Sequence, residues 1–88
     1  MAWKIEFDDK AIKQLDKLDS GIRKRMLNFL YERAIASGNP RSFGEPLTGT
    51  LASLWRYRVG HYRIVCDIRD GELLVLVVQV GHRREIYR

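Results

Sequence analysis

The chain has 88 residues, of which 45% are hydrophobic and 31% charged, and its formal net charge is +5. This length suits one domain over residues 1–88, and the composition is that of a folded globular protein. A single cysteine excludes an intramolecular disulfide and a cysteine-based zinc site, and no apolar run approaches the ~20 residues that span a bilayer. We therefore expect a cytoplasmic domain whose basic charge favours polyanions such as RNA or DNA.

The first segment predicts a short strand and then a helix. Apolar and charged residues alternate over residues 3–7, as in a strand with one buried face. Asp8 or Asp9 can cap a helix, because a carboxylate accepts the free N–H groups of a first turn. Apolar residues at helical spacing extend this helix to about residue 18: Ala11, Ile12, Leu15 and Leu18.

A second helix is predicted after a short break. Ser20 can cap it, and Gly38 is placed for a left-handed C-terminal cap before Pro40. Its apolar stripe consists of Ile22, Met26, Phe29, Leu30 and Ala34. The two helices are expected to form a helical hairpin, followed by a loop over residues 41–50, which are rich in Gly, Pro, Ser and Thr.

The C-terminal half predicts three strands in a meander. Residues 54–59 alternate, residues 60–61 can turn, and residues 62–68 continue as a second strand. Asp70-Gly71 is a strong hairpin signal, and the apolar residues 73–80 suit a central strand covered on both faces. The order predicts an α+β fold: a small antiparallel sheet, made of the N-terminal strand and this meander, packed against the helical hairpin. The first strand is expected at an edge of the sheet or beside the apolar strand.

Arginines cluster in the predicted meander. Residues 46–66 contain no carboxylate but three arginines with aromatic residues between them. Strand alternation and hairpin pairing can bring these arginines and the C-terminal segment to one region of the sheet. The residues that can converge there are Arg56, Arg58, Arg63, Arg83 and Tyr87. From the pattern alone, a phosphate-binding site and an ordinary solvated basic face are equally good interpretations, although the planar guanidinium suits bidentate phosphate binding.

Three segments, in this order and at this spacing, resemble the RelE/ParE superfamily of bacterial toxins from toxin–antitoxin operons. They are IEFD with Ala11 and LDKL at residues 5–18, PLTG with LWRYRVGHYRIV at residues 46–65, and VGHRREIY at residues 80–87. The last segment favours the RelE-type ribonucleases over the ParE-type gyrase poisons. The resemblance implies a RelE-like domain, with a small antiparallel sheet and two N-terminal helices, and neither a metal nor an organic cofactor.

The resemblance also implies an activity. RelE-like toxins are metal-independent mRNA interferases that cut translated mRNA in the ribosomal A site by 2′-OH attack, which inhibits translation and growth. Such an enzyme takes the 2′-OH proton, stabilises a dianionic phosphorane and protonates the leaving oxygen. The catalytic positions carried over are Arg56, Arg58, Arg63, His82, Arg83 and Tyr87. The implied partners are an acidic RelB-like antitoxin, the ribosome and mRNA, without a membrane; operator DNA binding by the toxin–antitoxin complex stays open.

The general base is an open question, because RelE has lysines where this chain has Arg56 and Arg58. A crowded lysine can lose its proton, whereas an arginine stays charged. His61 or His82 could serve instead, since histidine titrates near neutrality, although a solvated turn residue is the simpler interpretation of His61. Two other functions remain open: a ParE-like gyrase inhibitor that cuts nothing, and a basic module that only represses its operon with a partner.

Overall fold

The structure is a computed structural model that describes residues 2–47 and 53–82. In chain order, this part holds β1 (Lys4–Phe7), α1 (Asp9–Asp16), α2 (Ser20–Phe29), a π-helical continuation (Leu30–Ile35), a 3-10 turn (Pro40–Ser42), β2 (Glu45–Pro46), β3 (Trp55–Val59), β4 (Tyr62–Arg69), a further 3-10 turn (Asp70–Glu72) and β5 (Leu74–His82). The order is the predicted α+β order with one additional short strand, β2. None of the described helices is long and apolar enough to cross a membrane.

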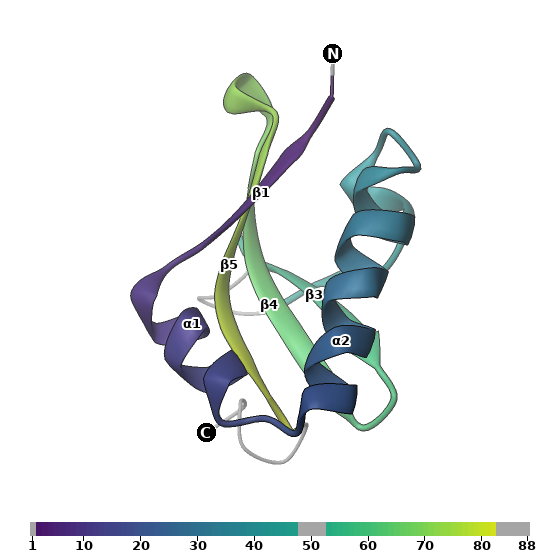
Figure 1. Cartoon of the computed structure of the whole chain (residues 1–88). Coiled ribbons are helices and arrows are strands. Elements are labelled where there is room, and N and C mark those ends of the chain that lie inside the picture. The colour runs from purple at the N-terminus through teal and green to yellow at the C-terminus, as the bar shows by residue number, and fades with distance from the viewer. Residues whose placement is uncertain (1, 48–52, 83–88) are drawn as a thin grey trace.

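The described strands form one sheet in the order β1-β5-β4-β3-β2. The strands β3, β4 and β5 form the predicted antiparallel meander, whereas β1 runs parallel to β5, with Ile5 opposite Val75. The sheet is therefore mixed, whereas a purely antiparallel sheet was expected. The sequence pattern could not separate the two, because a hydrophobic period of two is the same in both pairing directions. Figure 1 shows α1 on the β1–β5 side of the sheet and α2 on the β3–β4 side.

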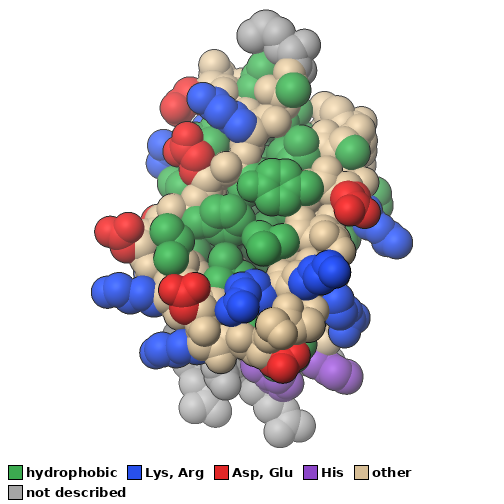
Figure 2. All heavy atoms as spheres, viewed as in Figure 1, with side chains coloured by type: hydrophobic (Ala, Val, Ile, Leu, Met, Phe, Trp, Pro, Cys, Tyr) green, Lys and Arg blue, Asp and Glu red, His purple; other side chains and the backbone are tan. Residues whose placement is uncertain are grey.

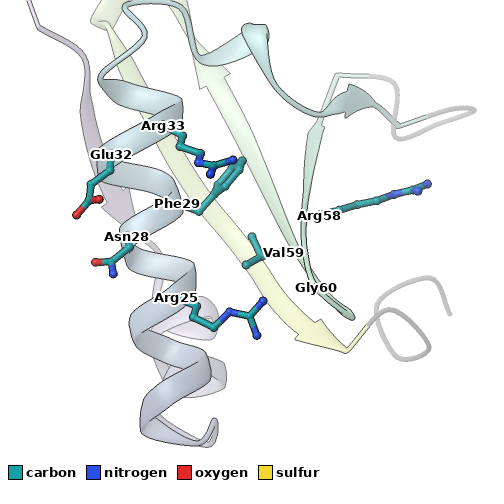
Figure 3. Close-up of a pocket in the computed structure, with 8 residues that line it drawn as sticks. All are labelled: Arg25, Asn28, Phe29, Glu32, Arg33, Arg58, Val59 and Gly60. Carbon is teal, nitrogen blue, oxygen red and sulfur yellow. The ribbon is translucent and has the colours of Figure 1, made fainter.

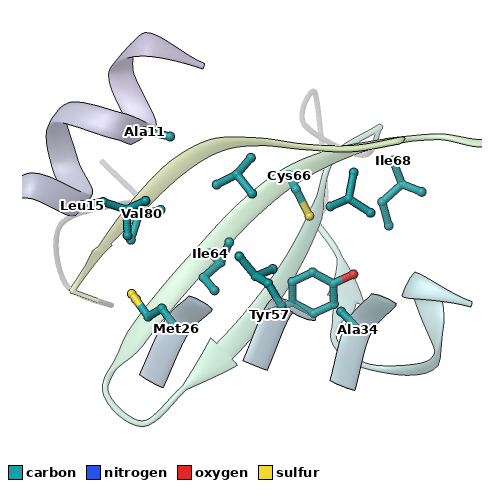
Figure 4. Close-up of a cluster of buried hydrophobic side chains, with 12 residues drawn as sticks. Ala11, Leu15, Met26, Ala34, Tyr57, Ile64, Cys66, Ile68 and Val80 are labelled. Carbon is teal, nitrogen blue, oxygen red and sulfur yellow. The ribbon is translucent and has the colours of Figure 1, made fainter. Parts of the chain in front are cut away.

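The hydrophobic core fills the space between the helices and one face of the sheet (Figure 4). Tyr57, Ile64 and Val80 are register neighbours across β3, β4 and β5, and each is at most 2% exposed. Leu15 of α1 and Met26 of α2 pack into the same cluster. Because side chains alternate along a strand, the residues between these buried positions project from the opposite face of the sheet.

The helix N-termini confirm one predicted cap and correct the other. Asp8 caps α1, as its Oδ1 accepts the backbone N–H of Ala11 at 2.8 Å. The cap of α2 is Asp19 rather than Ser20, because Asp19 Oδ2 accepts the backbone N–H of Gly21 at 3.0 Å and Ser20 is already helical. Aspartate and serine can both cap a helix, so the local sequence did not show whether Asp19 or Ser20 is the cap.

The residues expected to form a loop, 41–50, contain a strand that the sequence pattern did not indicate. The strand β2 pairs antiparallel with β3, with Glu45 opposite Arg56 and Pro46 opposite Trp55. A two-residue strand that ends in proline has no alternation of its own, which is why pattern reasoning missed it. Residues 48–50 of the expected loop lie outside the described part of the chain.

The predicted turns are present, with one difference in length. Gly60 (φ 61°) turns the chain between β3 and β4, and Gly38 (φ 81°) follows the helical segment that ends at Ile35. The turn between β4 and β5 is longer than a two-residue hairpin, since a 3-10 turn leads into Leu73 at φ 49°. Arg41 holds Asp70 in this turn through two hydrogen bonds of 2.8 and 2.9 Å.

Candidate functional site

Arginines of the β3–β4 hairpin share the sheet face that is turned away from the helices. Arg58 lies directly opposite Arg63, and Arg56 lies opposite Val65. Tyr57, between the two β3 arginines, points into the core, so Arg56 and Arg58 must project from the other face. The structure thus brings together the three arginines that the sequence analysis singled out in the meander. We call this cluster, Arg56, Arg58 and Arg63, the arginine face.

The three arginines differ in how far they reach into solvent. The Arg58 side chain is 62% exposed and extends away from α2 (Figure 3). The Arg56 side chain is 14% exposed, and Arg63 is 7% exposed as a whole residue. Arg56 and Arg63 therefore have directions limited by their surroundings, whereas Arg58 is the cation most available to an incoming anion.

Glu45 is a site residue that the sequence analysis missed. Its Oε1 forms an ion pair with Nη2 of Arg56 and lies 3.3 Å from Nη2 of Arg58. The hydrogen bond from Arg56, and then the charge of that guanidinium, lowers the pKa of Glu45 below its ordinary value. Glu45 stands one residue before the carboxylate-free stretch 46–66, and only the β2–β3 pairing shows that it belongs with the arginines.

Glycine and tryptophan hold β2 close to β3. Gly44 has φ 78°, and a Cβ added there would lie 2.2 Å from the backbone oxygen of Arg56, so another residue would push the strands apart. The indole Nε1 of Trp55 donates to the Phe43 carbonyl at 2.7 Å. These contacts fix the position of Glu45, the next residue, against the arginine face.

The two histidines lie together at one end of the molecule (Figure 2). The His61 and His82 rings stack with centroids 6.4 Å apart and planes inclined by 19°. His82 is opposite Tyr62 in the β4–β5 register, and their rings meet edge to face at 5.4 Å. By strand alternation His82 projects from the face opposite to Arg63, so it borders the arginine face at the end of the sheet rather than lying within it.

The other two predicted site residues, Arg83 and Tyr87, lie outside the described residues. Within the described ranges 2–47 and 53–82, there is no group of three or more His, Cys, Asp or Glu side chains that could hold a metal ion. The described part of the site thus offers arginines that can bind and neutralise a phosphate, a carboxylate that can accept a proton, and two imidazoles that can accept or donate one.

A mixed sheet with two helices on one face and arginines on the other defines a small α+β class of basic domain. The family model described as ParE toxin of type II toxin–antitoxin system, parDE, matches residues 5–87 of this chain. The chain therefore belongs to this family of toxins, within the superfamily that the sequence motifs indicated.

Curated relatives place the chain on the RelE-like side of the superfamily. Toxin RelG of Mycobacterium tuberculosis is 32% identical over 88 residues, which are 100% of this chain and 99% of the relative. The mRNA interferase toxin RelE of Escherichia coli is 30% identical over 91 residues, covering 99% of this chain and 92% of the relative. The protein is accordingly a RelE-like toxin of a toxin–antitoxin system.

Solved structures agree with this assignment. The toxin–antitoxin complex RelBE2 of M. tuberculosis matches with a TM-score of 0.85 and 28% identity, over 94% of this chain and 100% of that one. The isolated E. coli RelE toxin matches with a TM-score of 0.76 and 29% identity, over 98% and 92% of the two chains. The fold is therefore that of the RelE-like toxins.

Proposed function

We propose that this toxin is a ribosome-dependent endoribonuclease, an mRNA interferase that cuts translated mRNA in the A site by attack of a 2′-OH on the adjacent phosphorus. The observation that carries the proposal is the arginine face with Glu45 seated against it. A carboxylate in contact with two guanidinium groups occupies a position that a phosphate oxygen can also occupy. The RelE relative of E. coli is named an mRNA interferase toxin, which supports the same activity.

The arginines supply the charge that the reaction needs. Attack of the 2′-oxygen forms a phosphorane with two negative charges, and preorganised cations stabilise it more than they stabilise the substrate. Arg58 is exposed enough to meet the phosphate first, while the more buried Arg56 and Arg63 need little reorganisation. The three guanidinium groups remain charged throughout, so none of them removes the 2′-OH proton.

Glu45 is the proposed proton acceptor. While Arg56 and Arg58 bind its carboxylate, the lowered pKa makes it a weak base. A phosphate that draws these guanidinium groups toward itself weakens the ion pairs, so the pKa of Glu45 rises toward its ordinary value. The base thus gains strength when substrate arrives. His82, beside the arginine face, is the proposed donor of a proton to the leaving 5′-oxygen, because a protonated imidazole is a hydrogen-bond donor that can give up its proton.

The ribosome is the proposed source of substrate positioning. The described hollow beside Glu45, Arg56 and Arg58 has a volume of about 250 Å³, so it does little to hold a flexible RNA in line for attack. Fixing the reacting groups in an attack geometry contributes about 7–11 kcal/mol to a barrier. An mRNA held in the A site, in the cytoplasm, would arrive with much of that positioning complete.

The proposed inhibitor is an acidic antitoxin from an adjacent gene. The arginine face attracts an acidic segment, and charge complementarity speeds association. Hydrophobic side chains also gather in the middle of the opposite side of the molecule (Figure 2), and Ile12 and Tyr31 of the helical segments are 45% and 51% exposed. Several structurally similar chains were solved as toxin–antitoxin complexes, which supports such a partner.

A ParE-like gyrase inhibitor without nuclease activity is the second candidate, favoured by the description of the matching family model. Controlled expression in cells, with primer extension on a reporter mRNA, separates the two functions. The wild-type chain should produce cuts inside translated codons, and Arg58→Ala, which changes an exposed side chain, should remove them. Growth arrest with DNA breaks and an uncut reporter would support the gyrase inhibitor and refute the nuclease.

A further inference from the structure

A second basic surface lies around the end of β3 that leads into the Gly60 turn, next to the arginine face. Between α2 and this end of the strand is a cleft of about 410 Å³, lined among others by Arg25, Phe29, Arg33, Arg58, Val59 and Gly60. Arg58 belongs to both surfaces, because it lines the cleft and also pairs with Glu45 on the arginine face. The two surfaces are thus continuous around the edge of the sheet.

Three arginines and one carboxylate, Glu32, are among the residues that line this cleft, so the charge of its lining is net positive. Figure 3 shows Arg25 and Arg33 pointing from the helix toward the sheet on either side of Phe29, whereas Asn28 and Glu32 point away along the other side of the helix. Arg33 is eight positions after Arg25, a separation of about 12 Å along the axis at the α-helical rise. Arg25 lies close to the Gly60 turn, since a Cβ added at Gly60 would be 3.2 Å from its Nη2.

The two cleft arginines have no internal counterion in the described part of the chain. Other arginines do: Arg41 pairs with Asp70, Arg56 with Glu45, and Arg69 with Asp67. Neither Arg25 nor Arg33 takes part in an ion pair with any other described residue. Two unneutralised guanidinium groups that face the same cleft favour an anionic ligand with several charges along its length.

We propose that this cleft binds the phosphodiester backbone of an RNA strand that continues from the arginine face around the end of β3 and onto α2. The proposal rests on the proposed function and assigns it a second RNA-binding surface. Arg25 and Arg33 would each hold a phosphate, and the half-buried Phe29 between them offers ring surface to a base. The RNA comes either from the mRNA or from the ribosome, because the phosphate chemistry is the same.

The cleft suits RNA better than an acidic protein segment. Protein segments that dock in grooves gain affinity from several apolar side chains buried in pockets. The described lining of this cleft has two apolar side chains, Phe29 and Val59, which are too few to form the apolar pockets of such a segment. Backbone binding to RNA needs mainly spaced cations and a ring, which the cleft has.

The test compares Arg25→Gln/Arg33→Gln with Lys13→Gln/Lys24→Gln, a control that removes the same charge from exposed positions outside the cleft. Thermal melting checks that both variants fold. Fluorescence anisotropy with a labelled 20-nucleotide single-stranded RNA measures affinity over a series of salt concentrations. The cleft variant should bind roughly tenfold more weakly, and its slope of log K against log salt should fall by about 1.4, for two lost phosphate contacts. The control should stay close to wild type.

Two further arms identify the source of the RNA and the competing occupant. Cosedimentation with ribosomes then separates the two sources of RNA. Loss of free RNA binding with ribosome binding intact assigns the cleft to mRNA, and loss of both assigns it to ribosomal RNA. Equal losses in the cleft and control variants would overturn the proposal, as would loss of antitoxin binding with RNA and ribosome binding intact. A wild-type chain that binds neither RNA nor ribosomes would instead refute the proposed function itself.

Discussion

Glu45 of β2 lies directly opposite Arg56 of β3, and its carboxylate is in contact with the Arg56 guanidinium. This pairing places a carboxylate beside the arginine face. In the sequence that follows Glu45, residues 46–66 contain three arginines and no carboxylate. It also answers a chemical difficulty, because arginines stabilise a phosphorane but do not accept a proton. The first prediction follows from this pair.

Replacing Glu45 by Gln keeps the shape of the side chain and removes its ability to accept a proton. We expect cleavage to slow by about 10²–10⁴-fold, the usual contribution of a general base, with RNA affinity equal to or above that of wild type. RNA affinity should be kept or raised, because the substitution removes a negative charge from a phosphate-binding face. Single-turnover cleavage and RNA binding, measured on the same preparation, check both parts. Full activity in Glu45→Gln would reduce Glu45 to a positioning residue for Arg56 and Arg58 and would transfer the role of base to a histidine.

Arg58 is the cation whose removal tests the arginine face most cleanly. Its side chain is 62% exposed, so Arg58→Ala should leave the melting temperature unchanged while lowering cleavage by about 10²–10³-fold. Arg58→Lys should keep part of the activity, because the charge remains and only the bidentate geometry is lost. Arg69→Ala, at another exposed arginine of the sheet, is the matched control and should be fully active. Equal toxicity of Arg58→Ala and Arg69→Ala in cells would contradict a catalytic role for the cluster.

Tyr57 makes a stability prediction that is independent of function. Its hydroxyl donates to the Pro40 carbonyl at 2.6 Å, and both residues are fully buried. Tyr57→Phe leaves that carbonyl without its donor and should lower the free energy of unfolding by about 1–2 kcal/mol. Tyr31→Phe, at a position 51% exposed, should change it little. Urea denaturation of both variants measures the difference, and equal stability would show that water replaces the lost donor.

Cys66 should be chemically inert in the folded protein. The side chain is 0% exposed, and burial raises the pKa of its thiol to about 12. The reactive species is the thiolate, so at pH 8 the higher pKa alone slows alkylation roughly a thousandfold relative to an ordinary cysteine. Mass spectrometry after iodoacetamide treatment should find unmodified native protein and full labelling in urea. Rapid labelling of the native chain would show that the β3–β4 hairpin opens readily.

Local patterns in the sequence were sufficient for the features that repeat over a few residues. Alternation over residues 54–59 separates Tyr57, which is buried, from Arg56 and Arg58, which face the other way. The turn at Gly60 then makes Arg58 and Arg63 neighbours, as hairpin pairing requires. The arginine face could therefore be predicted before its structure was known, because each step depends on residues close in sequence.

Features that depend on long-range pairing could not be predicted in the same way. The strand β2 has two residues and no pattern, so its partner β3 determines that it exists. The position of Glu45 depends on that pairing and on Gly44, whose missing side chain allows the close approach. The stacking of His61 on His82 joins a turn to the end of the last strand, and neither residue indicates the other in sequence. The sequence analysis named both histidines but missed Glu45, because Glu45 meets the arginines only through the pairing of β2 with β3.

The most direct measurement of the central claim is cleavage of a single mRNA by the purified wild-type toxin, with and without ribosomes programmed on that message. The account predicts cuts only in the presence of ribosomes and only inside translated codons. The 5′ fragments should end in a 2′,3′-cyclic phosphate or its hydrolysis product. Rapid cutting of free RNA, including untranslated regions, would contradict ribosome dependence. An intact mRNA under both conditions would contradict the nuclease itself.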